Sequence, residues 1–149
     1  MTEVLFYHLE RQPLDAVLPS MLERCIERNW RVVVETGSPE RVDALDALLW
    51  TYSEESFLPH GTARDPNASE HPILLASEAT NPNRATVRFA VDGASLGPVA
   101  GFDRVVLIFD GSDDAALAQA RTDWRRAKAD GLAATYWQQN ESGRWEKKA

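Results

Sequence analysis

The densest group of side chains able to do chemistry lies in the segment 121–128, which holds four of the sixteen basic residues of the chain. If the segment is helical, one face carries residues at i, i+3, i+4 and i+7: Arg121, Trp124, Arg125 and Lys128. Leu117 lies one turn earlier. Such a face suits a short acidic peptide with an apolar end, because cations pair with carboxylates and an apolar tip packs on the indole. The alternative is structural: late basic residues complement the helix dipole, and Trp124 belongs to the core.

A second group follows an expected helix that ends near Trp50. An acidic turn leads into an irregular segment that contains Phe57, Pro59 and His60. This segment has neither helical nor strand periodicity. Aromatic side chains on irregular segments often anchor protein interfaces. We therefore expect either a partner-binding surface or a loop that Phe57 and Leu58 attach to the core.

Three carboxylates, those of Asp110, Asp113 and Asp114, cluster where an expected strand ends and a helix begins. Carboxylates in that position can hold Mg²⁺. Acidic residues in a first helical turn also stabilise the helix dipole, which is the simpler interpretation. The alternative function that this cluster supports is a small metal-binding or nucleotide-binding α/β enzyme.

Other catalytic patterns are missing from the sequence. The first strand-to-helix turn, residues 8–13, has no glycine for a dinucleotide, and no phosphate-loop or GxSxG motif occurs. The three histidines show no ligand spacing, and Cys25 falls on an apolar helix face, where it acts as a small hydrophobe. We expect no catalytic residue, no metal site and no cofactor, and therefore not an enzyme.

The elements that must position these groups alternate along the chain. Helices are expected over 14–26, 39–50 and 113–129, with Pro19 either kinking the first helix or standing in its first turn. Strands are expected over 4–8, 30–34, 73–75, 87–91, 104–109 and 135–139. The polar tail from residue 141 has no expected element. The alternation predicts one α/β domain over 1–149, with a mostly parallel or mixed central sheet and helices on both faces, Rossmann-like but without a phosphate loop.

Composition limits the partners. The chain has 149 residues, a formal net charge of −7 and one cysteine. The negative charge argues against strong direct binding to nucleic acid, although a local basic patch stays open. A single cysteine excludes an intramolecular disulfide. No long apolar run and no signal-like start occur, so we expect a cytoplasmic protein without a membrane partner.

The segment around the second group is specific enough to compare with a known family. Leu45-Asp46-x-x-Leu49-Trp50, followed by Ser56-Phe57-Leu58-Pro59-His60-Gly61, resembles the signature of the chi subunit of bacterial DNA polymerase III. The first strand with Phe6-Tyr7, the segment 30–32 and the ending from Tyr136 to Trp145 are also similar to that family. The resemblance runs along nearly the whole chain and is loose only over 62–98.

The resemblance implies a non-catalytic accessory subunit of the clamp loader in DNA replication, located at the cytoplasmic, nucleoid-associated replisome. Family members bind the psi subunit and the acidic, phenylalanine-ended C-terminal tail of single-stranded DNA-binding protein, so contact with DNA is indirect. Trp50, Phe57, Pro59 and His60 match the psi-binding element. The tail-binding helix is matched by Arg121, Trp124, Arg125 and Lys128, with Leu117 beside them and a pocket near Phe109 for the terminal ring. Trp124 replaces a common tyrosine, and Arg125 a common lysine.

Overall fold

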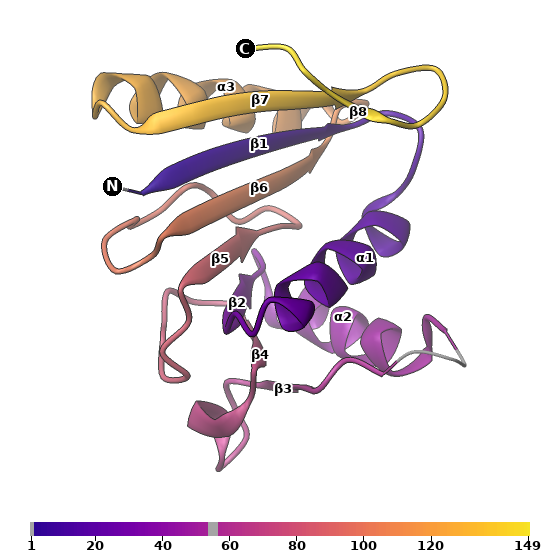
Figure 1. Cartoon of the computed structure of the whole chain (residues 1–149), viewed down its shortest axis with the longest axis vertical. Coiled ribbons are helices and arrows are strands. Elements are labelled where there is room, and N and C mark those ends of the chain that lie inside the picture. Colours follow the sequence, from indigo (N-terminus) through magenta and orange to yellow (C-terminus); the bar gives the residue numbers. More distant parts are fainter. Residues whose placement is uncertain (1, 54–56) are drawn as a thin grey trace.

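A sheet of eight strands organises the residues that the computed structural model describes, 2–53 and 57–149 (Figure 1). In chain order the strands are β1 (Glu3–Leu9), β2 (Val32–Glu35), β3 (His60–Thr62), β4 (Ile73–Ala76), β5 (Val87–Ala90), β6 (Arg104–Asp110), β7 (Ala133–Gln139) and β8 (Trp145–Lys147). Across the sheet their order is β3-β4-β2-β5-β6-β1-β7-β8. All neighbouring pairs are parallel except β7 and β8. The predicted α/β class and mixed sheet are confirmed.

The helices cover both faces of this sheet. The helices α1 (Leu14–Glu27) and α2 (Pro39–Thr51) pack on one face, and α3 (Asp114–Ala129) packs on the other (Figure 1). A short 3₁₀ helix, η1 (Ala68–Glu70), precedes β4. None of the helices in the described residues combines the length and the apolar character that a bilayer-spanning segment requires.

Local sequence signals set the helix ends. Ser38 caps α2 by accepting a hydrogen bond from the Arg41 N–H, and Pro39 occupies the first helical position. Asp113 caps α3 by accepting from the N–H groups of Ala115 and Ala116. Gly131 follows α3 with a φ of 73°, a left-handed conformation that glycine adopts without strain. Serine or aspartate before a helix and glycine after one are residue types that favour helix ends.

Alternation along β1 sends its side chains to two different layers. Val4 and Phe6 are fully buried on the α3 side, while Leu5 and Tyr7 face the side of α1 and α2. Phe6 pairs in register with Tyr136 of β7, and Tyr7 pairs with Trp137. Neighbouring aromatic pairs therefore lie on opposite faces of the same two strands.

Three details differ from the sequence expectations. The segment after Pro59 was expected to be irregular, yet His60 begins the edge strand β3, and the tail forms the edge strand β8. Each has only three residues, too few for an alternation pattern to be recognised. Pro19 lies inside α1 beyond its first turn, so the first-turn alternative is wrong and the interior alternative holds. Cys25 is buried as expected, and burial raises its pKa to about 11.

Candidate functional site

Helix α3 presents the predicted basic group on one side because its other side is anchored by alanines. Ala120 and Ala127 are buried on the sheet side of the helix. Small side chains let the helix lie close to the strands. Arg121, Arg125 and Lys128 point outward, while Trp124 lies at the edge of the contact and packs on Phe6 of the sheet. We call the group formed by five of the larger side chains of α3 the α3 surface: Leu117, Arg121, Trp124, Arg125 and Lys128.

The indole of Trp124 is neither fully exposed nor part of the closed core. Its ring meets Phe6 edge to face, with centroids 5.3 Å apart, and Tyr136 at 5.8 Å. The Nζ atom of Lys128 lies 5.3 Å from the centroid of the indole. Trp124 remains half-buried, so one part of the ring is fixed by the fold while another part stays open. The structural interpretation of Trp124 therefore holds in part, because its ring packs on the core, and the binding interpretation stays a prediction.

The guanidinium groups on this face differ in how the fold uses them. Arg126 pairs with Asp130 at 3.4 Å and donates a hydrogen bond to the carbonyl of Gly97. Arg121 and Arg125 are exposed, and among residues 2–53 and 57–149 neither makes an ion pair or a hydrogen bond through its guanidinium. The fold thus leaves two positive charges available beside the indole.

A set of half-buried aromatic side chains extends the α3 surface toward the ends of β1, β6 and β7. The Nδ1 atom of His8 lies 2.7 Å from the hydroxyl of Tyr136, and Phe109 lies 5.2 Å from His8 and 6.0 Å from Tyr136 between ring centroids. Burial raises the pKa of Tyr136, while the charge of Arg121 opposes that rise. Arg121 is therefore close enough to act on the phenol. Phe109 was predicted here; His8 and Tyr136 were not.

Gly111 makes room for this aromatic set. A β-carbon at position 111 would lie 1.8 Å from the Nε2 atom of His8, which no side chain tolerates. The ring of His8 therefore sits over the turn between β6 and α3 only because residue 111 is glycine. Asp110-Gly111 after a buried strand indicates a turn, but the position of His8 over it depends on a distant strand and has no signal in the sequence.

The second predicted group forms an exposed aromatic pair at the end of α2. The side chains of Trp50 and Phe57 are 59% and 67% exposed, and their ring centroids lie 5.8 Å apart. Leu58, next in sequence, is 1% exposed and joins the core. The loop is thus anchored by Leu58, while Phe57 points to solvent. We call Trp50, Phe57, Pro59 and His60 the Trp50 surface.

His60 has a different place from its neighbours on the Trp50 surface. Its side chain is fully buried beneath Trp50, with ring centroids 5.0 Å apart. The Nδ1 atom lies 2.8 Å from the carbonyl oxygen of Leu58, and Nε2 lies 2.9 Å from Oδ1 of Asp46. His60 therefore supports the aromatic pair from below. Pro59 is half-buried, and the turn residues Glu54, Glu55 and Ser56 lie outside the described residues.

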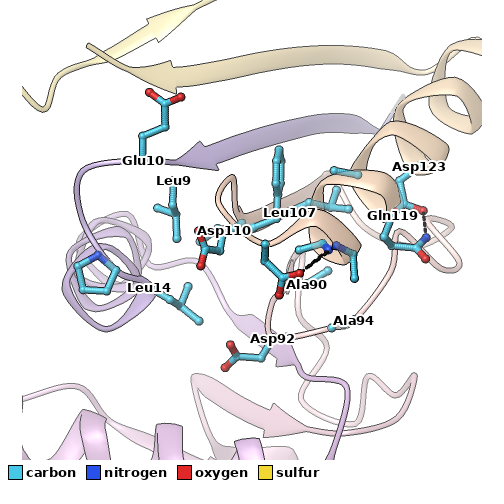
Figure 2. Close-up of a pocket in the computed structure, with 18 of the residues that line it drawn as sticks. Leu9, Glu10, Leu14, Ala90, Asp92, Ala94, Leu107, Asp110, Gln119 and Asp123 are labelled. Carbon is cyan, nitrogen blue, oxygen red and sulfur yellow. Dashed lines mark hydrogen bonds between the residues drawn. The ribbon is translucent and has the colours of Figure 1, made fainter. Parts of the chain in front are cut away.

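A crevice of about 770 Å³ opens at the carboxyl ends of β1, β5 and β6 (Figure 2). Open α/β sheets bind nucleotides and other ligands in this position. The carboxylates in it are already engaged. Asp92 pairs with Arg41 at 2.9 Å, Asp113 caps α3, and Asp110 accepts hydrogen bonds from the N–H and hydroxyl of Ser112, which hold its pKa below the usual range.

The crevice does not bring the predicted acidic cluster together as a metal site. Asp114 is exposed in the first turn of α3, and Asp113 and Asp110 satisfy backbone N–H groups. Within the described ranges, no group of three or more His, Cys, Asp or Glu side chains is arranged to hold a metal ion. Asp110 and Asp113 therefore have structural roles at the turn before α3, where they accept hydrogen bonds from backbone N–H groups.

Comparison with known proteins agrees with the earlier resemblance. The model of the family described as DNA polymerase III chi subunit, HolC, matches residues 1–135, which include both the α3 surface and the Trp50 surface. A protein of Rickettsia prowazekii (strain Madrid E), named probable DNA polymerase III subunit chi, is 27% identical over 117 residues. That match covers 74% of this chain and 71% of the relative.

Proposed function

Because the chain belongs to the DNA polymerase III chi subunit family, which serves DNA replication, we propose that it joins two other proteins at the replisome. The α3 surface binds the acidic, phenylalanine-ended C-terminal tail of single-stranded DNA-binding protein. The Trp50 surface binds the psi subunit of the clamp loader. The chain itself is an accessory subunit of the cytoplasmic polymerase complex and catalyses no reaction of its own.

The observation that carries the proposal is the pair of unpaired guanidinium groups on an acidic protein. The chain has a formal net charge of −7, yet Arg121 and Arg125 meet no carboxylate within the described part of the structure. An acidic tail supplies the missing partners, and charge-assisted hydrogen bonds to carboxylates are among the stronger polar contacts in proteins. The tail's own negative charge is repelled elsewhere on the surface, which favours binding at α3.

The aromatic set beside α3 supplies the apolar part of the mechanism. Trp124 and Phe109 each meet Tyr136, with ring centroids 5.8 and 6.0 Å apart, and all three rings are only half-buried. A terminal phenylalanine ring that packs among them completes an aromatic cluster that the fold leaves open. Arg121, which already acts on the phenol of Tyr136, then stands beside the terminal carboxylate.

This proposal is tested by calorimetric titration of a short acidic peptide that ends in phenylalanine. We expect a dissociation constant near the micromolar range, as a small interface implies. Arg125→Glu should weaken binding by at least about 100-fold without changing the melting temperature, because the exposed side chain supports no contact in the fold. A peptide that lacks its terminal phenylalanine should also fail to bind. If Arg125→Glu binds the full peptide as well as the natural chain does, the assignment to α3 is wrong.

The proposal for the Trp50 surface rests on two large apolar side chains that the fold leaves in solvent. Trp50 and Phe57 are the exposed large hydrophobic residues of the described chain, and they touch each other. Such neighbours resemble the aromatic anchors of protein interfaces. Burying both rings in a partner removes apolar area from water, which is favourable. The buried ring of His60 packs against Trp50 and fixes its position.

The test is a binding assay with purified psi subunit. Phe57→Ala should weaken psi binding at least about tenfold, the loss typical of an aromatic anchor, and leave tail-peptide binding unchanged. The control is Pro66→Ala, a substitution of another exposed residue on a neighbouring loop, which should bind psi normally. Normal psi binding by Phe57→Ala and Trp50→Ala would remove the Trp50 surface from the proposal.

A further inference from the structure

The sheet face opposite α3 is covered unevenly. In Figure 1 the helices α1 and α2 lie over the half of the sheet that holds β2 to β5, while β7 and β8 extend beyond them. A hollow of about 410 Å³ remains between the last turns of α1 and strands β6, β1, β7 and β8. We call it the sheet hollow. It belongs to neither the α3 surface nor the Trp50 surface.

Aromatic rings form one part of the sheet hollow. Tyr7 stacks on Trp137 of the neighbouring strand, with centroids 6.2 Å apart and planes 17° apart. Trp145 of β8 meets Tyr7 edge to face at 4.9 Å. All three rings are half-buried, so the fold fixes their positions and leaves part of each accessible. Three of the five tryptophans of the chain line this hollow: Trp30, Trp137 and Trp145.

Arginines form the other part. The guanidinium carbons of Arg28 and Arg104 lie 5.0 and 4.4 Å from the centroid of Trp30. Arg24 is exposed on α1 and acts on the phenol of Tyr7, where its charge lowers a pKa that burial raises. The acidic residue in the lining is Glu3, which pairs with Arg104 at 3.4 Å. Three cations and one carboxylate therefore give the lining a net charge of +2 in a chain whose net charge is −7.

Positive charge beside accessible aromatic rings on a sheet is the chemistry that binds single-stranded nucleic acid. Bases stack on aromatic faces whatever their identity, and arginines hold the phosphates. We propose that the sheet hollow binds single-stranded DNA, with one base against the rings of Tyr7, Trp137 or Trp145 and the adjacent phosphates at Arg24 and Arg28. The volume suits one nucleotide unit, because it lies within the range of small-ligand sites. The choice of DNA over RNA rests on the proposed function in replication.

An acidic peptide is the other class of partner that a basic surface attracts. The proposed function already places the tail peptide at the α3 surface, and a planar base can stack on one ring of the hollow while it meets another at its edge, so DNA is favoured here. The guanidinium groups of Arg28 and Arg104 already lie over Trp30, which holds them at the rim as an ordered pair. Ordered cations bind a phosphate backbone with less loss of side-chain entropy.

The test measures fluorescence anisotropy of a labelled oligothymidylate of about 20 nucleotides at low salt, where phosphate contacts are strongest. We expect a dissociation constant on the order of 10⁻⁴ M, weak because the whole chain is acidic. Arg24→Glu and Arg28→Glu should each weaken binding about tenfold, and both should retain tail-peptide binding. The charge-matched Arg125→Glu should bind the oligonucleotide normally, although it loses the tail peptide. Trp145→Leu keeps an apolar side chain and should weaken DNA binding by loss of a ring.

The outcomes distinguish a failure of the proposed DNA site from a failure of the proposed tail-binding site. Loss of DNA binding in the α1 variants, with normal tail binding, supports the sheet hollow even if the tail peptide binds elsewhere than α3. Absence of oligothymidylate binding at millimolar protein would overturn it. If Arg24→Glu and Arg28→Glu bind the oligonucleotide as well as the natural chain does, the proposal is also wrong. If only Arg125→Glu loses the oligonucleotide, DNA binds at the α3 surface and not at the sheet hollow. Equally tight binding of oligouridylate, or of the tail peptide at the sheet hollow, contradicts the choice of DNA.

Discussion

The α3 surface and the Trp50 surface both present a tryptophan, but the fold treats the two rings in opposite ways. Trp124 packs edge to face on Phe6 and Tyr136 and lies next to unpaired cations. Trp50 is 59% exposed and contacts Phe57, which is 67% exposed. One ring is part of a partly formed pocket beside unpaired cations, and the other is part of an exposed pair of aromatic rings.

The difference indicates two kinds of recognition on one small protein. A charged pocket attracts a flexible acidic segment from a distance and weakens as salt screens its field. An exposed aromatic pair gains free energy mainly by leaving water, which salt screens little. The two proposed contacts should therefore differ in how strongly they depend on salt. The predictions below test whether the two surfaces are as separate as this.

The largest effect is expected in the loop that carries the Trp50 surface, at two adjacent residues of which one is buried and one exposed. Leu58→Ala should lower the free energy of unfolding by about 2–5 kcal/mol, because a fully buried leucine leaves a cavity. Phe57→Ala should change it by less than about 0.5 kcal/mol, since the ring is in solvent. Denaturant unfolding of both variants measures the contrast. Similar losses in the two would mean that Phe57 holds the loop and is not free for a partner.

The next largest effect is a difference in stability and peptide binding between Trp124→Ala and Trp50→Ala. Trp124→Ala should cost about 2 kcal/mol, less than a fully buried tryptophan, and should also abolish tail-peptide binding. Trp50→Ala should cost under about 1 kcal/mol and leave peptide binding intact. Thermal unfolding and peptide titration of both variants test this. The conservative Trp124→Phe, which keeps a ring against Phe6, should restore most of the stability. Peptide binding by a folded Trp124→Ala would refute the role of the indole.

A smaller effect is expected from salt, which should weaken binding at the α3 surface more than binding at the Trp50 surface. Raising ionic strength from about 0.05 to about 0.5 M should weaken tail-peptide binding roughly tenfold or more, because Arg121 and Arg125 are exposed. Binding of psi through Trp50 and Phe57 should change less than about twofold over the same range. Parallel titrations provide the measurement. Equal salt dependence would contradict the division into a charged and an apolar surface.

The sequence predicted those parts of the molecule that local patterns determine. Ser38, Pro39 and Gly131 mark helix ends by their own chemistry, and continuous apolar runs marked the buried strands. The helix expected over 113–129 is confirmed by α3, so the basic residues of 121–128 have the helical spacing that the sequence predicted. These features need no knowledge of distant contacts.

Features that depend on distant contacts were not predictable. The half-burial of Trp124 depends on Phe6 and Tyr136, which lie in two other strands. The edge strands β3 and β8 exist because the neighbouring strands offer hydrogen bonds, and three residues carry no pattern of their own. The sheet hollow joins residues from α1, β1, β6, β7 and β8, so no single segment of sequence shows it.

The smallest expected effect is the pH response of the aromatic set. Burial lowers the pKa of His8 below 6.5, an effect larger than that of the nearby carboxylates of Glu10 and Asp110. As pH falls through 6.5, the unfolded chain takes up a proton before the folded chain does, so stability present above that pH is lost. Melting temperatures at about pH 7.5 and 5.5 should therefore differ less in His8→Gln than in the natural chain. An equal or larger difference in the variant would show that His8 contributes nothing to it.

The central claim is that the α3 surface is open and separate from the Trp50 surface, and the tryptophans report on it directly. The chain has five of them: Trp124 on α3, Trp50 at the end of α2, and Trp30, Trp137 and Trp145 in the sheet hollow. Nuclear magnetic resonance resolves one indole N–H signal for each. Titration with the acidic, phenylalanine-ended peptide should shift the Trp124 signal and leave the Trp50 signal in place. A shift of Trp50 with no change at Trp124 would contradict the account.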